Sequence, residues 1–508
     1  MYASDEVSNF EQLYESYLQK EEIFIDEDFP PQHDIMLSNH WEISEKSSYW
    51  KDLIFVKASK IFRTDKLQVL PPKLLPSNIQ QGELGNSYLL SALAVLAEVP
   101  DLLSRLFIVK DPNPSGIYCI WLCDNGEWRP VALDDVLPVR EHGGKLLPAF
   151  SHSSAPELWV SLIEKAYAKI HGSYENIEGG FPEETLRDLT GAPYELIWGE
   201  SDSDKVQNTI SNALRQGFLV AGCTSVSENP DERLPSGLRP GHAYAILRAE
   251  DVNTVRGTES LLQIRNPWGD FEWNGDWGYE SPLWSEKLKK QLGVTQREED
   301  VFWMSAEDYL ANFEATCVLK YNPNYEYYSA HLLHEQENYT ILRVTVSQPS
   351  NVTFSMNQRD SRFFSGREGE EYSYSCARML VARIEGKKGL IYITGAHGQE
   401  RNLQSSARLE PGVYLVALEI HWNQSFHRAF NFSVYTQHPV SMEGVGKADL
   451  LLIQKNIIKN IILTNPPENQ QTDNYEKLGE SDVVRRVGYI HGLIYYYYEN
   501  NSKQLTLI

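Results

Sequence analysis

The sequence predicts an α+β protein of several domains, with a β-sandwich in its second half. Three observations support this fold class. Helical and strand patterns alternate from residue 50 to about 195, and strand patterns dominate from about 200 to 320. Short strands separated by turn signals then recur from 328 to 437, which is typical of two packed antiparallel sheets. At about 150 residues per domain, the 508 residues correspond to three or four domains.

The first half of the chain contains the clearest local signals. Residues 1–23 form an acidic, helix-prone leader without the apolar core of a signal peptide. Strand patterns at 116–123 and 128–139 flank Asp124-Asn125-Gly126, a strong hairpin signal. Residues 157–170 repeat apolar side chains at i, i+3 and i+4, which predicts a helix.

The end of the chain differs in composition from the rest. Residues 448–462 have the pattern of an amphipathic helix, and β-forming residues dominate the segment that follows the polar stretch 465–474. We therefore assign 439–508 to a C-terminal extension.

Composition excludes several classes of function. The chain has 46 Lys and Arg against 70 Asp and Glu, a net charge of −24. Such a surface repels nucleic acid and anionic membranes, and it suits cation binding or basic protein partners. No run reaches the roughly 20 apolar residues of a membrane span. The five cysteines match neither a zinc spacing nor a dense disulfide framework, so we expect a reducing, cytoplasmic location.

One segment has the form of a nucleophile-bearing helix. A glycine-rich turn from Gln81 leads into an almost wholly apolar run at 88–97, and Asn86 or Ser87 can cap its first turn. The start of a buried helix offers unpaired N–H groups and the positive end of the helix dipole. This position lowers the pKa of a thiol and stabilises a developing anion. Taken alone, the segment is better explained as an ordinary capped core helix.

Two later segments favour the catalytic interpretation. His242 follows a glycine in an apolar strand pattern, and Asn266 precedes Pro-Trp-Gly. The separations are 242 − 87 = 155 and 266 − 242 = 24 residues. Papain-type enzymes place a histidine and an asparagine downstream of their nucleophile in this order. The imidazole acts as base and the amide holds it, while the Gln81 side chain could join an oxyanion hole.

These motifs resemble those of the calpain family of papain-type cysteine proteases over roughly residues 23–320. The matching segments are Gln81-Gly-x-Leu-Gly-x-Ser87, Gly241-His242-Ala-Tyr, Arg265-Asn266-Pro-Trp-Gly-x-x-Glu272-Trp, Phe24-x-Asp26-x-x-Phe29-Pro-Pro, Glu164-Lys-Ala-Tyr-Ala-Lys-x-x-Gly-Ser-Tyr174 and Phe302-Trp-Met-Ser305. The resemblance implies a two-lobed core, a helical lobe at 24–198 and a β-rich lobe at 199–322. It also implies that the sandwich at 323–438 is the one that follows a calpain core.

Ser87 is the main departure from the family pattern, which has cysteine there. A hydroxyl is a far weaker acid than a thiol, and papain-type sites are built around a preformed thiolate–imidazolium pair. Three hypotheses follow: a pseudoprotease that acts as a binding or structural module, an engineered Cys-to-Ser change in an active enzyme, or a working serine nucleophile. A second departure is Asn86, where many relatives have Asp.

The resemblance also implies one calcium ion in each lobe, but the expected ligands are only partly present. In the helical lobe Asn78 stands where an aspartate is expected, and its partner Glu157 is retained. In the β-rich lobe Glu272 is retained and Glu299 could replace an aspartate. Tyr279 and Val301 occupy the other positions of carboxylate ligands. Because calcium prefers six to eight oxygens, we expect weakened binding at both sites.

Other cofactors and partners are less defined by the sequence. No calcium loop of the EF-hand type occurs, and nothing indicates an organic cofactor. The resemblance implies a protein substrate or a protein partner. The Asn-, Ile-, Lys- and Tyr-rich tail suggests an AT-rich genome such as that of a protist, where calpain-like proteins are associated with the cytoskeleton and the flagellum.

Overall fold

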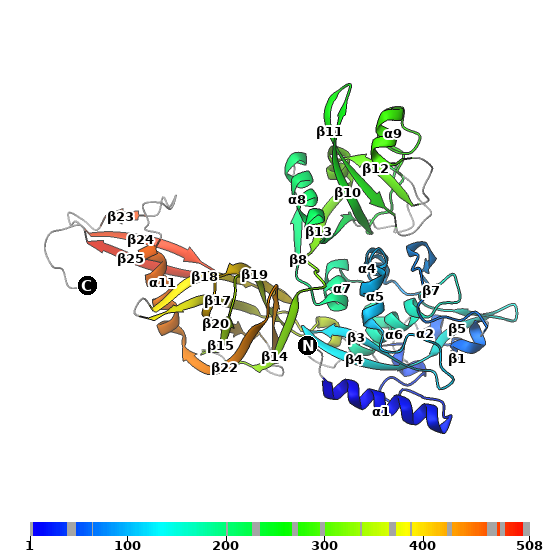
Figure 1. Ribbon diagram of the computed structural model, residues 1–508. Helices are drawn as coiled ribbons and strands as arrows, with labels where there is room; N and C mark the ends of the chain where they lie inside the picture. Colours follow the sequence, from blue (N-terminus) through cyan, green and yellow to red (C-terminus); the bar gives the residue numbers. More distant parts are fainter. Residues whose placement is uncertain are drawn as a thin grey trace.

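The computed structural model describes most of the chain, namely residues 4–37, 47–62, 65–199, 202–225, 234–266, 273–294, 300–335, 338–364, 372–386, 389–423, 429–464, 475–477 and 483–500. Figure 1 shows a helical lobe, a β-rich lobe beside it, a β-sandwich, and a small terminal sheet farthest from the two lobes. This arrangement confirms the α+β class and the sandwich. No helix in the described part of the chain has the length and apolarity needed to cross a bilayer.

The helical lobe combines helices with short antiparallel strands. Its helices are α1 (Ser4–Lys20), α2 (Ser47–Trp50), α3 (Ala58–Ile61), α4 (Ser87–Ala97), α5 (Pro100–Leu106), α6 (Trp159–His171) and α7 (Pro182–Thr190), with single 3-10 turns η1 (His33–Ile35), η2 (Pro76–Asn78) and η3 (Glu175–Ile177). Its strands are β1 (Ile54–Lys57), β2 (Ile79–Gln80), β3 (Ile117–Asp124), β4 (Glu127–Asp134), β5 (Val136–His142), β6 (Lys145–Pro148) and β7 (His152–Ser153). They pair as β1-β5-β6, β2-β7 and β3-β4.

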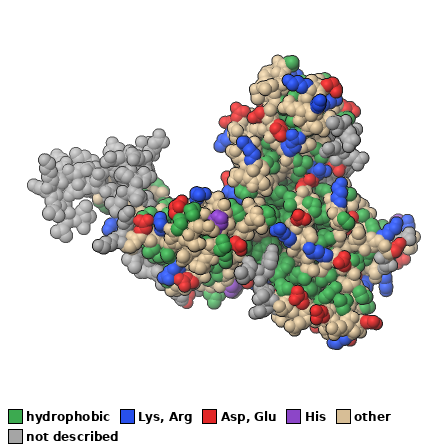
Figure 2. All heavy atoms as spheres, viewed as in Figure 1, with side chains coloured by type: hydrophobic (Ala, Val, Ile, Leu, Met, Phe, Trp, Pro, Cys, Tyr) green, Lys and Arg blue, Asp and Glu red, His purple; other side chains and the backbone are tan. Residues whose placement is uncertain are grey.

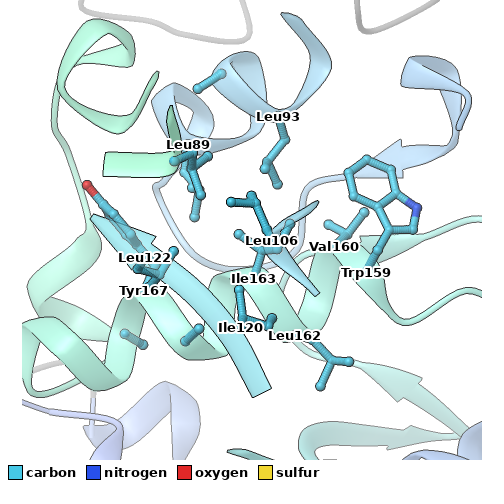
Figure 3. Close-up of a cluster of buried hydrophobic side chains, with 14 of the residues drawn as sticks. Leu89, Leu93, Leu106, Ile120, Leu122, Trp159, Val160, Leu162, Ile163 and Tyr167 are labelled. Atoms are coloured by element: carbon cyan, nitrogen blue, oxygen red, sulfur yellow. The ribbon is translucent and has the colours of Figure 1, made fainter. Parts of the chain in front are cut away.

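The predicted hairpin and the predicted helix are both confirmed. Strands β3 and β4 are joined by Asn125 and Gly126, whose φ angles of 52° and 76° are those of a tight hairpin turn. Helix α6 spans most of the segment predicted from its periodicity. Figure 3 shows how α6 packs with α4 and β3, through side chains such as Leu89, Ile120 and Ile163. This packing fixes α4 against the core of the lobe.

The leader helix α1 lies on the far side of this lobe. Its Phe10 is buried in the same core, and the helix packs against β4. In Figure 1 it runs beneath β3 and β4, whereas α4 faces the β-rich lobe.

The β-rich lobe is built on one six-stranded antiparallel sheet in the order β12-β11-β10-β9-β13-β8. Its elements are β8 (Tyr194–Trp198), α8 (Ser203–Arg215), β9 (Leu219–Thr224), β10 (Ala243–Thr254), β11 (Gly257–Arg265), α9 (Glu286–Leu292), β12 (Val301–Ser305), α10 (Ala306–Asn312) and β13 (Phe313–Leu319). Because β8 pairs with β13, the sheet begins a few residues before 199, where we expected the lobe to start.

Two packed sheets form the sandwich. The four-stranded sheet has the order β14-β21-β16-β19 and the five-stranded sheet the order β18-β17-β20-β15-β22. Their bounds are β14 (Glu326–Leu333), β15 (Asn338–Val346), β16 (Ser350–Asn357), η4 (Ser361–Phe364), β17 (Cys376–Glu385), β18 (Gly389–Gly398), β19 (Asn402–Leu409), β20 (Gly412–His421), β21 (Ala429–Thr436) and β22 (Val440–Asp449). Strand β22 pairs with β15, so the sheet continues past residue 438.

The remaining extension packs on the outside of the sandwich. Helix α11 (Leu450–Thr464) buries Ile453 and Ile457 against the outer face of the five-stranded sheet. A small sheet follows, with strands β23 (Tyr475–Lys477), β24 (Val483–Ile490) and β25 (Leu493–Asn500). In the space-filling view, acidic and basic side chains are interspersed over the visible face of the lobes (Figure 2).

Candidate active site

Helix α4 begins at Ser87, as its sequence predicts, and it is buried from Tyr88 to Ala97. Only Ser87, at its first position, remains partly exposed. The N–H groups of Leu89 and Leu90 donate to the carbonyl oxygen of Asn86. The N–H groups that precede them, including that of Ser87, lie outside the helical ladder. Residue 87 therefore stands where a helix offers its positive end to an anion.

The expectation that the Asn86 side chain caps this helix is wrong. Asn86 is the N-cap residue, but its side chain makes no capping hydrogen bond. It is fully buried, and its Nδ2 donates instead to Oε1 of Glu164 on α6 at 2.6 Å. The N–H of Ser151 donates to the same carboxyl group at 3.0 Å. The Asn86 side chain therefore hydrogen-bonds to the buried Glu164 carboxyl group instead of to the N–H groups of its own helix.

Glu164 is a buried titratable residue that is hydrogen-bonded to the N-cap residue of α4. Burial raises the pKa of Glu164 to about 7, although hydrogen bonds from Ser151 and Asn86 oppose the shift. The sequence motif that contains Glu164 gave it no role, although an acid on the buried face of a predicted helix is an indication of one.

The pH dependence of stability should report this group. Between pH 4.5 and 7 the unfolded chain ionises Glu164 while the folded protein keeps its proton, so stability falls as pH rises through this window. Glu164→Gln should remove a decrease of about 3 kcal/mol over that range. Urea unfolding of both proteins from pH 4 to 8 measures this. Identical pH profiles would contradict the assignment.

The loop before α4 contacts the rest of the helical lobe through backbone atoms. A side chain at Gly82 would place a Cβ 2.3 Å from the carbonyl oxygen of Ala149, so only glycine fits this close approach. The N–H of Glu83 donates to the same oxygen at 2.8 Å. The Gln81 amide donates through Nε2 to the carbonyl oxygen of Leu84 at 3.0 Å, which uses one of its two protons.

His242 lies immediately before β10, and both its backbone and its ring are hydrogen-bonded. Its backbone N–H donates to Thr224 Oγ1 at 3.0 Å, and its carbonyl oxygen accepts from the Thr224 N–H at 3.0 Å. Its ring Nδ1 lies 2.6 Å from the carbonyl oxygen of Pro240. Because a carbonyl oxygen only accepts, Nδ1 carries the proton, which makes Nε2 the basic nitrogen of the neutral ring. The buried imidazole is therefore oriented by backbone on its Nδ1 side.

The β-rich lobe contacts α4 at two points along its length. The N–H of Ala243 donates to Ser91 Oγ at 3.4 Å, one helical turn after Ser87. Arg265 Nε lies 2.6 Å from Oε1 of Glu98, the residue that ends the helix.

These contacts fix the direction of β10 relative to the helix. Arg265 pairs with Ala245 in the sheet, so β10 advances from the start of α4 toward its end. His242 therefore lies on the Ser87 side of the Ala243–Ser91 contact.

Asn266 follows β11 directly and is buried. Its N–H donates to the carbonyl oxygen of Asp300 at 2.7 Å. Since β11 is the antiparallel neighbour of β10, Asn266 lies on the strand next to the one that follows His242. Ser87 begins α4, His242 precedes the strand that contacts this helix through Ala243, and Asn266 follows the neighbouring strand. A nucleophile position, an imidazole base and amide groups are the components of acyl-transfer chemistry.

Asn78 and Glu157 lie together but do not fit a calcium site. Asn78 Nδ2 donates to Glu157 Oε1 at 3.3 Å, while Ser153 Oγ and Trp159 Nε1 donate to Oε2 at 2.8 and 3.0 Å. Hydrogen-bond donors therefore face both carboxylate oxygens where a cation would need further oxygens. Glu272 and Glu299 lie outside the described residues. Val301 begins β12 and offers no side-chain oxygen, and Tyr279 is exposed.

A cluster of buried acids and one histidine, which the sequence analysis missed, lies between the helical lobe and the sandwich. His171, Asp188 and Asp360 could together ligate a metal by distance alone. Arg401, however, donates to both oxygens of Asp188 at 2.9 and 3.0 Å, and Arg362 donates to Asp360 at 2.7 Å. Guanidinium groups thus provide the positive charge, and the cluster is an ion-pair network.

Comparisons with known proteins agree with the resemblance carried by the sequence motifs. The model of the calpain family of cysteine proteases matches residues 24–320. A calpain-type cysteine protease named DEK1 from Arabidopsis thaliana is 41% identical over 264 residues, covering 50% of this chain and 12% of the relative. Calpain-type cysteine protease ADL1 from Oryza sativa subsp. japonica is 34% identical, covering 73% and 18%, and calpain-9 from Rattus norvegicus is 33% identical, covering 62% and 45%. The chain thus spans less than half the length of these relatives.

Proposed function

Because the chain belongs to the calpain family of cysteine proteases, we propose that with Ser87 it is a catalytically inactive calpain-type protein that acts as a binding or structural module for polypeptides. One observation carries the proposal. Ser87 occupies the first position of α4, one turn before Ser91, whose hydroxyl accepts from the strand that follows His242, and at this position the family pattern has the thiol of cysteine.

The chemistry of the hydroxyl supports inactivity. A cysteine at a helix start ionises readily and attacks as a thiolate, while a serine hydroxyl must lose its proton during the attack. A neutral imidazole with its proton on Nδ1 could accept that proton only through Nε2, in a geometry built for a thiolate–imidazolium pair. The carbonyl carbon of a bound peptide would therefore remain unattacked.

The two helices nearest the described ends of the chain do not cover this site. Helix α1 packs beneath β3 and β4, and α11 packs on the outer face of the sandwich. Neither helix lies at the start of α4 (Figure 1).

An alternative function is a cysteine endopeptidase in which position 87 carries an engineered change. The retained loop, base and amide positions favour this candidate equally, since they are needed for catalysis and not for binding alone. The codon at position 87 of the source gene distinguishes the two.

The test of the proposal uses the protein with Ser87 and casein. We expect casein to be bound, as measured by fluorescence anisotropy of the labelled substrate, and to stay intact over hours with calcium or with chelator. Robust cleavage would overturn the proposal and favour a serine nucleophile. Absence of binding in a folded protein would overturn the role as a polypeptide-binding module.

We further propose that the core has little calcium dependence. The hydrogen-bonded Asn78–Glu157 pair supports this, because a cation would have to displace several donors from the carboxylate. Titration calorimetry should detect no micromolar calcium site, and Glu157→Ala should not change the titration. Two micromolar sites, one of them lost with Glu157→Ala and the other with Glu272→Ala, would contradict this prediction.

A further inference from the structure

The residue that follows Ser87 is held by the sandwich as well as by its own lobe. Tyr88 is buried, and its hydroxyl donates to the carbonyl oxygen of Ile177 at 3.0 Å. The Tyr88 hydroxyl oxygen in turn accepts from Arg362 Nη1 at 2.7 Å. Arg362 belongs to η4 of the sandwich, 274 residues away in sequence. The guanidinium also lies over the Tyr88 ring, 5.5 Å from its centroid.

Arg362 is itself fixed by a carboxylate. Its Nε and Nη2 donate to the two oxygens of Asp360 at 3.0 and 2.7 Å, which is the paired geometry that arginine makes best. Arg401 and His171 hold Asp360 from the other side, at 3.2 and 3.4 Å. Because Nε and Nη2 are bound to Asp360, the guanidinium is oriented so that Nη1 reaches the Tyr88 hydroxyl.

A glycine turn closes the remaining space around the tyrosine ring. A Cβ at Gly180 would lie 2.7 Å from the Tyr88 ring and 2.9 Å from Arg362 Nη1, and the φ of this residue is 150°. The N–H of Gly179 donates to the carbonyl oxygen of Gly85, in the loop that precedes Ser87, at 2.9 Å. The ring therefore has little freedom to adopt another rotamer.

We propose that Arg362 is a positioning residue of the active site, which acts through Tyr88 to fix the first turn of α4 and so the orientation of the side chain at position 87. The β-sandwich would in this way control the geometry of the nucleophile position. This inference rests on the proposed active site at residue 87, but it does not require that the site be catalytically active.

The test measures a thiol placed at position 87. In a Ser87→Cys background, the rate of alkylation by iodoacetamide is followed between pH 5 and 9, with the modified peptide quantified by mass spectrometry. Arg362→Met should lower this rate about fivefold at neutral pH and move its midpoint to higher pH, because a loosened first turn stabilises the thiolate less. Arg362→Lys should restore part of the rate, since it keeps the charge without the paired geometry.

Arg359→Met is the matched control. Arg359 also joins the sandwich to the helical lobe, through Asp124 at 2.8 Å, and its other partners among the described residues, Ile170 and Phe363, lie outside α4. We expect its alkylation rate to stay within twofold of the background. Equal effects of Arg359→Met and Arg362→Met would overturn the proposal, because they would indicate only weakened domain packing.

Tyr88→Phe keeps the test valid if Arg362→Met fails to fold. It removes the hydroxyl that links the two residues and leaves the Arg362–Asp360 pair in place. We expect the same fall in alkylation rate with little change in the unfolding temperature. Where Arg362→Met does fold, combining the two substitutions should cause no further fall. An unchanged rate in Tyr88→Phe would overturn the proposal. Peptidase activity is not measured, so failure of the proposed function would not be mistaken for failure of this inference.

Discussion

Ser87→Cys is expected to increase the rate of peptide hydrolysis by several orders of magnitude. In a serine protease, loss of the nucleophile alone lowers the catalytic rate by about 10⁶, because the members of the catalytic set act as a unit. Gln81, His242 and Asn266 are all retained, and α4 would lower the pKa of the new thiol. Hydrolysis of a fluorogenic peptide, with calcium and with chelator, measures the gain.

The matched controls separate catalysis from contamination. Ser87→Ala should be as inactive as the protein with Ser87, and adding His242→Ala to Ser87→Cys should abolish most of the gain because the thiolate loses its partner. If the Ser87→Cys variant folds but does not cleave the peptide, we would infer that the two lobes do not bring residue 87 and His242 to the roughly 3 Å that proton transfer requires. The scaffold would then serve binding alone.

Arg401→Met is expected to lower the free energy of unfolding by about 3–5 kcal/mol, the cost of leaving buried charges without a partner. Arg401 is almost fully buried between Asp188 and Asp360, with Glu184 at 3.7 Å. Burial alone would raise the pKa of Asp360, but Arg401 and His171 hold it well below its usual range. Methionine fills a similar volume without the charge, so the loss reports mainly electrostatics.

Urea unfolding followed by circular dichroism measures this difference. Arg140→Met is the control, since Arg140 also pairs with a carboxylate, Glu83, at 2.6 Å, but at the surface. Exposed pairs contribute about 0–1 kcal/mol. Equal losses from the two substitutions would show that the buried network does not join the domains. Because the chain has several domains, the first unfolding transition is the one to compare.

Local sequence patterns predicted the elements that depend on neighbours in the chain. Helix α6 follows from its periodicity and the β3–β4 hairpin from Asn125-Gly126, because both signals act within a few residues. The same locality explains the error at Asn86. The capping rule considers only the helix start, whereas a buried carboxyl 78 residues away is the stronger partner.

Contacts between domains were beyond prediction. Asp188 and Arg401 are separated by 213 residues, and nothing in either local sequence indicates that they meet. The order of strands in a sheet is equally non-local. For this reason β8 precedes residue 199 and β22 follows residue 438, the limits that we expected for the β-rich lobe and the sandwich. The expectation that Ser87, His242 and Asn266 share one site rests on motif order, which reflects a shared fold and not a local rule.

Covalent labelling of position 87 tests the central claim most directly, namely that this residue occupies a papain-type nucleophile position served by His242. The Ser87→Cys variant is incubated with a peptidyl chloromethyl ketone, and the adducts are mapped by mass spectrometry. We predict one adduct, at position 87, whose formation falls strongly when His242→Ala is added. Labelling at another cysteine, or labelling at position 87 that is indifferent to His242→Ala, would contradict the claim.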